Sequence, residues 1–267
     1  MGLAIIAGAG GLPRALVRQL ATRPIVCALS GFEPDGVDVD EIFRLETLGT
    51  LLEGLRAKGV DEICLAGSIS RPVIDPTAID AATRPLIPLL QQALMRGDDG
   101  ALRAVMSVFE QAGFSVRAAH EIAPGLLPPA GCLTRNEPDE AAQADATRAE
   151  EIVDAMSAVD VGQCCVVQAG QALAIETVYG TDWMLRWLAA RPEHAAQGGI
   201  LFKATKRDQD KRADMPTIGV DTVASAITAG VRGVVVQTGG VLVLDQDEVT
   251  RACDDAGLFL WVRNRGG

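Results

Sequence analysis

The sequence predicts an α/β protein with an N-terminal Rossmann-like domain built on a parallel sheet and a C-terminal α/β domain with a mixed sheet. With 267 residues, 48% of them hydrophobic, the chain can bury the cores of two domains. Short apolar runs alternate with helical spacing in the first half, which is typical of a parallel sheet. The stretch from Glu121 to Pro138 holds four prolines and two glycines and cannot sustain a long element. We therefore place the domains at residues 1–132 and 133–267.

The N-terminal domain is predicted from short buried strands with helices between them. The strands are expected at Leu3–Ala7, Ile25–Ala28, Ile63–Ala66 and Ser115–Ala119. From Gln91 to Gln111 the apolar spacing is helical, but Gly97-Asp98-Asp99-Gly100 interrupts it. Two helices are expected to meet at this interruption.

The C-terminal domain is predicted to alternate helices and strands as well. Helices are expected at Asp139–Ser157, Thr181–Ala190, Asp221–Ala229 and Gln246–Ala256. Strands are expected at Cys164–Gln168, Ala172–Ile175, Ile200–Lys203, Gly233–Val236, Val241–Leu244 and Leu258–Val262. Because only a short turn containing Thr238-Gly239-Gly240 separates two of these strands, we expect a hairpin there and hence a mixed sheet.

Composition excludes several classes of function. The chain has 35 acidic and 24 basic residues, a net charge of −11, and 4% aromatic residues. Such a surface repels phosphate backbones and anionic lipid, so nucleic acid is not expected as a partner. The first ten residues lack a charged leader, and the six cysteines form no CxxC pair. We expect a soluble, cytoplasmic protein with reduced thiols.

Two glycine-containing loops follow predicted strands and are candidates for phosphate contact. Gly8–Pro13 reads GAGGLP, where glycines let the backbone approach a phosphate and a helix start offers its amides. Pro13 replaces the third glycine of a dinucleotide motif, which disfavours a nicotinamide cofactor. The second loop, Gly67–Pro72, follows the strand at Ile63–Ala66 and carries Arg71. A tight turn and a solvated loop without ligands are the structural alternatives.

Carboxylates near predicted helix starts are candidates for Mg²⁺ ligands. Asp98 and Asp99 precede one helix, and Asp182 begins another, with Glu176 six residues earlier at a strand end. The alternative is that these acids only cap their helices.

The segment Lys203–Gly219 carries the charge pattern that pyrophosphate cleavage requires. Five cations fall within ten residues, interleaved with Asp208, Asp210 and Asp214. Cations neutralise charge on phosphoryl oxygens, and a carboxylate can hold a metal or orient water. A solvated loop with mixed charges is the alternative. The two histidines lie in no motif, and no GxSxG elbow or cysteine–histidine pairing supplies a covalent nucleophile.

An ordered set of motifs over essentially the whole length resembles the LpxI family. The set comprises GAGGLP at Gly8, GDDGALR at Gly97, DVGQ at Asp160, IE at Ile175 with GTD at Gly180, and KA at Lys203 leading to DMPTIG at Asp214. The resemblance implies a Mg²⁺-dependent hydrolase that converts UDP-2,3-diacylglucosamine into 2,3-diacylglucosamine 1-phosphate and UMP in lipid A biosynthesis. It also implies a C-terminal catalytic domain. One departure is Lys206–Asp210, where the family pattern has Pro-Gly ahead of the glutamine.

The resemblance and the motifs together give the expected site. Asp214 takes the catalytic role. Substrate contacts are expected from Gly10, Gly11, Leu12, Gly67, Ser68, Gln163, Thr181, Lys203 and Thr217. Ligands for Mg²⁺ are expected among Asp214, Glu176, Asp98 and Asp182.

The expected partner is the lipid-linked UDP-sugar, with weak peripheral contact at the cytoplasmic face of the inner membrane. Homodimer formation stays open. A non-catalytic nucleotide-sugar or lipid-binding module is the alternative function, and a nicotinamide-dependent dehydrogenase is a third, weakened by the incomplete glycine motif.

Overall fold

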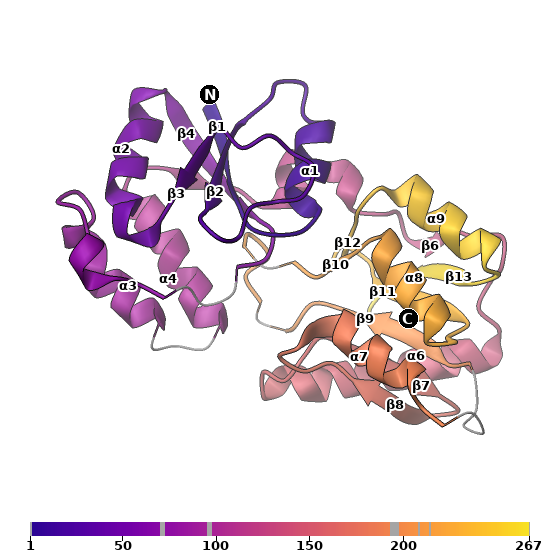
Figure 1. Ribbon diagram of the computed structural model, residues 1–267. Coiled ribbons are helices and arrows are strands. Elements are labelled where there is room, and N and C mark those ends of the chain that lie inside the picture. Colours follow the sequence, from indigo (N-terminus) through magenta and orange to yellow (C-terminus); the bar gives the residue numbers. More distant parts are fainter. Residues whose placement is uncertain are drawn as a thin grey trace. The chain divides into compact units, whose positions relative to one another are not determined.

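The computed structural model describes residues 2–69, 73–94, 98–192, 198–207, 209–213 and 215–266. The chain forms two compact units (Figure 1). Unit 1 comprises Met1–Gly125 and Asp210–Asp214, and unit 2 comprises Leu126–Gln209 and Met215–Gly267. No helix of the described residues is long and apolar enough to cross a bilayer.

Unit 1 is built on a five-stranded sheet in the order β3-β2-β1-β4-β5, with every neighbouring pair parallel. The strands are β1 (Gly2–Ala7), β2 (Ile25–Leu29), β3 (Glu41–Phe43), β4 (Val60–Ala66) and β5 (Ser115–Val116). The predicted Rossmann-like parallel sheet is confirmed. The strand predicted at Ser115–Ala119 is shorter than expected, because the short helix α5 (Ala119–Ile122) begins where it should continue.

Helices complete unit 1. They are α1 (Leu12–Gln19), α2 (Leu48–Ala57), α3 (Ile87–Leu94) and α4 (Asp98–Gln111), with short 3₁₀ turns at Leu45–Thr47, Pro76–Ala78, Arg84–Leu86 and Pro124–Leu126. The two helices expected on either side of Gly97 are therefore present. Alternate β1 residues such as Ile6 pack into one core cluster with Leu51 and Leu55 of α2 and Phe109 of α4.

Unit 2 contains a six-stranded sheet in the order β6-β13-β11-β9-β7-β8. The strands are β6 (Gly131–Cys132), β7 (Cys164–Gln168), β8 (Gln171–Ile175), β9 (Ile200–Lys203), β11 (Gly233–Gln237) and β13 (Phe259–Arg263). The three central strands β9, β11 and β13 are parallel, whereas β6, β7 and β8 pair antiparallel with a neighbour. The predicted mixed sheet is confirmed. Residues 131–132, assigned from sequence to the first domain, pair with β13 in this unit.

Helices cover both faces of this sheet (Figure 1). The long helix α6 (Glu140–Ala158) packs Ala146 and Val153 against the face that carries Phe202 and Val235. The helices α7 (Gly180–Ala189), α8 (Val220–Thr228) and α9 (Gln246–Asp255) pack on the other face, with Leu185, Val223 and Val249 in its core. The strands β7, β9, β11 and β13 are therefore buried on both sides, which explains why their sequences are apolar without alternation, whereas the edge strand β8 is largely exposed.

The hairpin predicted between the strands at 233–236 and 241–244 is wrong. The neighbours of β11 are β9 and β13, so both of its hydrogen-bonding edges are occupied. The turn at Gln237–Gly240 leads the chain away, and β12 (Leu242–Val243) pairs in parallel with β10 (Thr217–Ile218) as a separate two-stranded sheet. Antiparallel pairing comes instead from β6, β7 and β8.

Candidate functional site

The carboxyl edge of the unit 1 sheet brings the two glycine loops together. The strand order reverses direction between β1 and β4, which is the position where open α/β sheets bind ligands. The loops after these strands are joined by two backbone hydrogen bonds of 2.9 Å between Ala9 and Ser68, one in each direction. The predicted contacts Gly10, Gly67 and Ser68 therefore belong to one local structure. Arg71 of the second loop lies outside the described residues.

Glycine is required in these loops by conformation and by space. Gly10 and Gly67 have φ angles of +95° and +97°, a region that side chains disfavour. A Cβ atom on Gly67 would lie 2.4 Å from the carbonyl oxygen of Gly8. The close approach of the two loops thus depends on the absence of a side chain.

Helix α1 starts directly behind the first loop. Gly11 is its N-cap residue, Leu12 is its first residue, and no side chain of the described residues caps it. Its first turn contains no acid, so the positive end of the helix dipole is not compensated locally. The amides of Gly11 and Leu12 suit an anionic group such as a phosphate.

The carboxyl edge of the unit 2 sheet gathers the other predicted contacts. Lys203 ends β9 and lies opposite Cys164, the first residue of β7. Its ammonium donates to Thr181 Oγ1 at 2.9 Å and to the Thr217 carbonyl at 3.1 Å. The Thr181 hydroxyl in turn donates to Glu176 Oε1 at 2.6 Å. We call Lys203, Thr181 and Glu176 the polar relay.

Gln163 joins the polar relay through its backbone. Its amide donates to Glu176 Oε2 at 2.9 Å, and its side-chain Oε1 is buried without a hydrogen-bond partner among the described residues. Lys203, Thr181 and Glu176 are each almost fully buried, with exposures of 7%, 7% and 6%. A buried carbonyl-type oxygen and a buried ammonium in one place mark a site able to receive a polar ligand.

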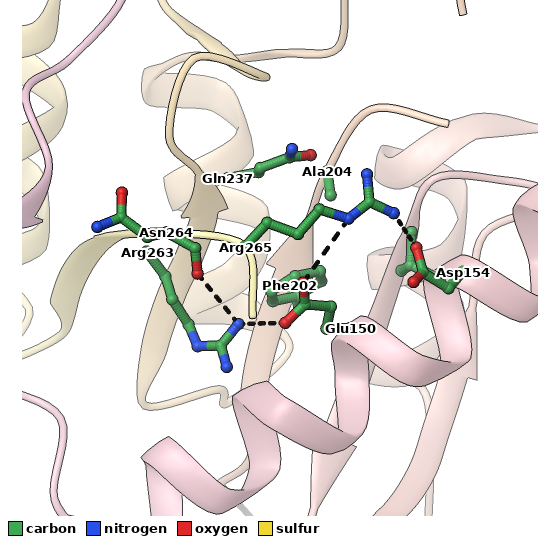
Figure 2. A pocket seen from close by; sticks show the side chains of 9 residues that line it. Glu150, Asp154, Phe202, Ala204, Gln237, Arg263, Asn264 and Arg265 are labelled. Carbon is green, nitrogen blue, oxygen red and sulfur yellow. Dashed lines mark hydrogen bonds and ion pairs between the residues drawn. The ribbon is translucent and has the colours of Figure 1, made fainter. Parts of the chain in front are cut away.

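On the α6 face of the same edge, a small cavity lies beside Arg263 at the end of β13 (Figure 2). Its volume of about 10 Å³ leaves room for one water molecule. Arg263 pairs with Glu150 of α6, and Arg265 pairs with both Glu150 and Asp154. These ion pairs fix the C-terminal residues to α6, and the cavity is too small for a substrate.

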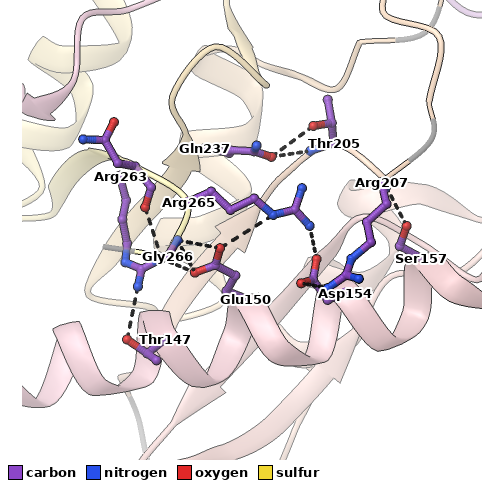
Figure 3. A network of polar contacts seen from close by, with 11 residues as sticks. Thr147, Glu150, Asp154, Ser157, Thr205, Arg207, Gln237, Arg263, Arg265 and Gly266 are labelled. Atoms are coloured by element: carbon purple, nitrogen blue, oxygen red, sulfur yellow. Dashed lines mark hydrogen bonds and ion pairs between the residues drawn. The ribbon is translucent and has the colours of Figure 1, made fainter.

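The segment that follows Lys203 is anchored to this network (Figure 3). Thr205 bonds Gln237 Oε1 through its amide and its hydroxyl, at 3.1 and 3.0 Å. The Arg207 amide donates to Ser157 Oγ at 2.8 Å, and its guanidinium pairs with Asp154 at 2.7 Å. Lys206 pairs with Asp160 at 2.6 Å. Two of the five cations that the sequence pattern assigned to phosphate contact therefore hold the segment in place.

Further along, residues 210–213 belong to unit 1. Arg212 pairs with Asp210 at 2.7 Å and with Glu110 of α4 at 2.8 Å, and the hydrogen bonding from Arg212 lowers the pKa of the Asp210 carboxyl. Ala213 packs against the unit 1 core. Asp214, the predicted catalytic residue, lies outside the described residues.

A complete metal site is not formed by the described side chains. No three potential ligands of the described residues gather at one point. Glu176 already accepts a hydrogen bond on each carboxylate oxygen, and Asp182 is exposed in the first turn of α7. Asp98 begins α4, and its side chain lies outside the described part. A Mg²⁺ site would therefore need oxygens beyond those of the described side chains.

The five buried thiols are unsuited to nucleophilic catalysis. Burial raises the pKa of Cys27, Cys64, Cys165 and Cys253 to about 12, and it also raises the pKa of Cys164, which lies beside the polar relay, well above the usual value of a thiol. Thiols in such surroundings stay protonated at neutral pH. Burial also lowers the pKa of His120.

Gln237 and Arg263 were not anticipated from sequence. Each is the last residue of an apolar strand, in GVVVQ and FLWVR, at the carboxyl edge of the parallel strands. A polar residue that ends a buried parallel strand is the signal that would have found them.

The fold and these two edges define the class of the molecule: an α/β protein of two units, each with loops and polar groups suited to ligands at the carboxyl edge of its sheet. The chain belongs to the LpxI family. The family model of the LpxI N-terminal domain matches residues 2–126, and that of the LpxI C-terminal domain matches residues 129–261. The chain is also 38% identical over 269 aligned positions to the UDP-2,3-diacylglucosamine pyrophosphatase LpxI of Caulobacter vibrioides, covering 97% of this chain and 96% of the relative.

The glycine loops generate the first prediction. Replacing Gly67 by alanine forces a side chain into a positive-φ position against the Gly8 carbonyl, and we expect it to lower the free energy of unfolding by about 2 kcal/mol or more. Gly54, inside α2, is the control, because a side chain there would meet no other atom within 4 Å. Gly54→Ala should raise stability by roughly 0.5 kcal/mol. Urea denaturation measures both, and equal effects would contradict the argument.

The polar relay generates the second prediction. Thr181→Val keeps the shape of the side chain but leaves the Glu176 carboxylate and the Lys203 ammonium each short of a buried partner. We expect a loss of about 1–3 kcal/mol in the free energy of unfolding. Thr228→Val removes an exposed hydroxyl bonded to Ala224 on α8 and should change stability by less than about 0.5 kcal/mol. Matching losses in the two variants would show that the relay is not a stabilising unit.

Proposed function

We propose that the chain is a hydrolase that cleaves the pyrophosphate bond of UDP-2,3-diacylglucosamine, releasing UMP and 2,3-diacylglucosamine 1-phosphate in lipid A biosynthesis. The observation that carries the proposal is the near full-length similarity to a pyrophosphatase of that name. The polar relay adds support, because positions far apart in sequence come together around Lys203, a buried cation.

The reaction adds water to one phosphorus and breaks the anhydride P–O bond, whose electron pair leaves with the other phosphate. Negative charge grows on the phosphoryl oxygens and on the leaving oxygen as the bond breaks. The ammonium of Lys203 uses two hydrogen bonds within the described residues, to Thr181 and Thr217, and has a third N–H for a phosphoryl oxygen. Because Thr181 and Thr217 fix its position, it stabilises this charge without reorganising.

The edge of unit 1 is proposed to bind an anionic portion of the nucleotide. The amides of Gly11 and Leu12 at the start of α1 and the crossed loops at Gly10 and Gly67 supply backbone donors without a competing acid in the first helical turn. Asp214 is proposed as the catalytic residue that orients the attacking water or holds the metal.

A divalent cation is part of this proposal. Asp214 would hold Mg²⁺ together with oxygens of the diphosphate, while Glu176 stays committed to Thr181 and Gln163. Asp98 and Asp182 are proposed to contact the ion through bound water molecules. When bound, the ion supplies neutralisation of phosphoryl charge.

The substrate's acyl chains lie in a membrane, so we propose that the protein works as a cytoplasmic, peripheral protein at the inner membrane. The net charge of −11 opposes adsorption to anionic lipid, and the attachment is therefore weak and apolar. A homodimer is compatible with this arrangement and is tested below.

The test against a purely binding module is direct. The purified protein is incubated with UDP-2,3-diacylglucosamine and Mg²⁺, and UMP is quantified by chromatography. Release of UMP over many turnovers supports the hydrolase, whereas binding without UMP identifies a module that only holds the ligand.

Asp214→Ala is expected to lower turnover by on the order of a hundredfold or more, because the lost interaction acts mainly in the transition state. Substrate affinity should largely survive, since a negative charge beside the diphosphate disappears. Lys203→Ala should weaken affinity and turnover together. Asp221→Ala, which removes an exposed acid at the start of α8, is the control. If Asp214→Ala keeps more than about a third of the parent turnover, under roughly 0.7 kcal/mol, its assignment is wrong.

Removal of divalent ions is expected to stop UMP release, and added Mg²⁺ should restore it. The polar relay contributes one buried cation, Lys203. Because the two phosphates of the substrate carry more negative charge than one ammonium can neutralise, a divalent ion is needed for the remainder. The measurement is the rate in excess EDTA and after stepwise return of Mg²⁺. Full turnover in EDTA would remove the metal from the proposal.

A further inference from the structure

Helix α7 presents an exposed row of aromatic side chains. Tyr179, Trp183 and Trp187 follow one another at intervals of four residues, so they form a single stripe. The ring centroids of Tyr179 and Trp183 lie 5.0 Å apart, and those of Trp183 and Trp187 lie 5.5 Å apart. The exposed fractions are 68%, 36% and 62% in sequence order. We call these three residues the aromatic row.

Helix α7 packs onto its sheet through its other side. The opposite side of α7 already buries Met184, Leu185 and Leu188 in the core of unit 2. A surface helix normally carries polar residues on the side that faces solvent. Because α7 is apolar on its solvent side as well as on its core side, its solvent side is expected to contact a second apolar environment. Val178, which directly precedes Tyr179 in the chain, is also exposed, at 83%, and α8, which packs against α7, exposes Ile227 at 42%.

The chemistry of the row is that of a membrane interface. The chain has one tyrosine and three tryptophans, and the row holds the tyrosine and two of the tryptophans. These two residue types concentrate at the level of lipid headgroups, where the ring meets hydrocarbon and the polar N–H or O–H meets water. Phenylalanine, which lacks the polar group, is present six times in the chain and is absent from the row.

A second copy of the chain fits the aromatic row less well than a membrane surface does. Whole tyrosine and tryptophan side chains expose about 150–250 Å², so at the exposed fractions given above the row offers roughly 350 Å². A specific dimer interface buries about 800 Å² on each partner. Insertion at a bilayer surface has no such minimum, because affinity grows with each apolar group that enters.

The location of the row fits a substrate that arrives from a membrane. Thr181, in the first turn of α7, is a member of the polar relay, and Tyr179 lies two residues before it. Helix α7 and its N-cap residue Tyr179 therefore carry both the site residue and the aromatic row. We propose that the aromatic row inserts into the headgroup region of the bilayer and holds unit 2 at the surface from which the lipid substrate is taken. This inference rests on the proposed function, which supplies the lipid-linked substrate.

The test uses the full chain and vesicles of phosphatidylcholine, with and without a fraction of phosphatidylglycerol. The parent should sediment with neutral vesicles, and lipids brominated in their acyl chains should quench its tryptophan fluorescence. Trp183→Gln combined with Trp187→Gln should lower the vesicle partition coefficient by on the order of tenfold or more. The anionic fraction should not strengthen binding, given the net charge of −11.

A matched control and a second assay separate the outcomes. Trp261, half-buried on β13 against the α6-side core, is replaced by phenylalanine and should leave vesicle partition within about twofold of the parent. UMP release from a water-soluble, short-chain substrate analogue should be unchanged in the double variant, while release from vesicle-embedded substrate falls. Circular dichroism checks folding of each variant.

Three results would overturn the inference: a parent that ignores vesicles, a double variant that binds them as the parent does, or a double variant that loses a dimer present in the parent. The last would assign the row to a second copy. Vesicle binding without UMP release from either substrate would instead refute the proposed function and leave the membrane surface standing.

Discussion

The hydrogen bonds that join Glu176, Thr181 and Lys203 are the interaction on which the polar edge of unit 2 depends. A lysine and a glutamate that are almost fully buried would each lose several kcal/mol of hydration if left alone. The threonine hydroxyl resolves this by accepting from the ammonium and donating to the carboxylate, in the one orientation that a hydroxyl allows. The backbone amide of Gln163 satisfies the second carboxylate oxygen. The charges stay balanced, and the ammonium keeps a direction fixed by its neighbours.

The rest of the edge is arranged around this unit by strand geometry. Antiparallel pairing sets the start of β7 and the end of β8 beside the end of β9, so Gln163, Glu176 and Lys203 meet although they are far apart in sequence. Gly162 permits the approach, because a side chain there would lie 2.4 Å from the Glu176 carbonyl oxygen. On the opposite face, Glu150 and Asp154 of α6 hold the C-terminal arginines and Arg207. The polar relay on one face and the ion pairs of α6 on the other thus fix the carboxyl edge of the sheet, where the segment that leads to Asp214 begins.

The sequence predicts the long apolar strands and most helices. Continuous apolar runs such as those in β1, β7 and β11 are typical of strands in a buried sheet. The prediction misses β3, in which only Phe43 is buried, and the two-residue strands β6 and β10, because their pairing is decided by neighbours distant in sequence. The prediction of a hairpin after Gln237 is wrong for the same reason. The residues of the turn do not reveal that β9 and β13 occupy both edges of β11. Of the site, the sequence predicts Gln163, Glu176, Thr181, Lys203 and Thr217, and these residues lie together. Gln237 and Arg263 were missed because their role follows from strand order.

The assignment of residues 210–214 to unit 1 has a consequence for the modularity of the molecule. The chain passes from one unit to the other after Gly125, after Gln209 and after Asp214. Neither unit is thus a single continuous stretch of polypeptide, and a truncation at residue 125 removes Arg212 and Ala213 from the structure they complete. An exchange of N-terminal halves between relatives would therefore have to carry the short second segment along with the first. A single crossover near residue 125 would leave residues 210–214 of unit 1 with the parent that supplies unit 2.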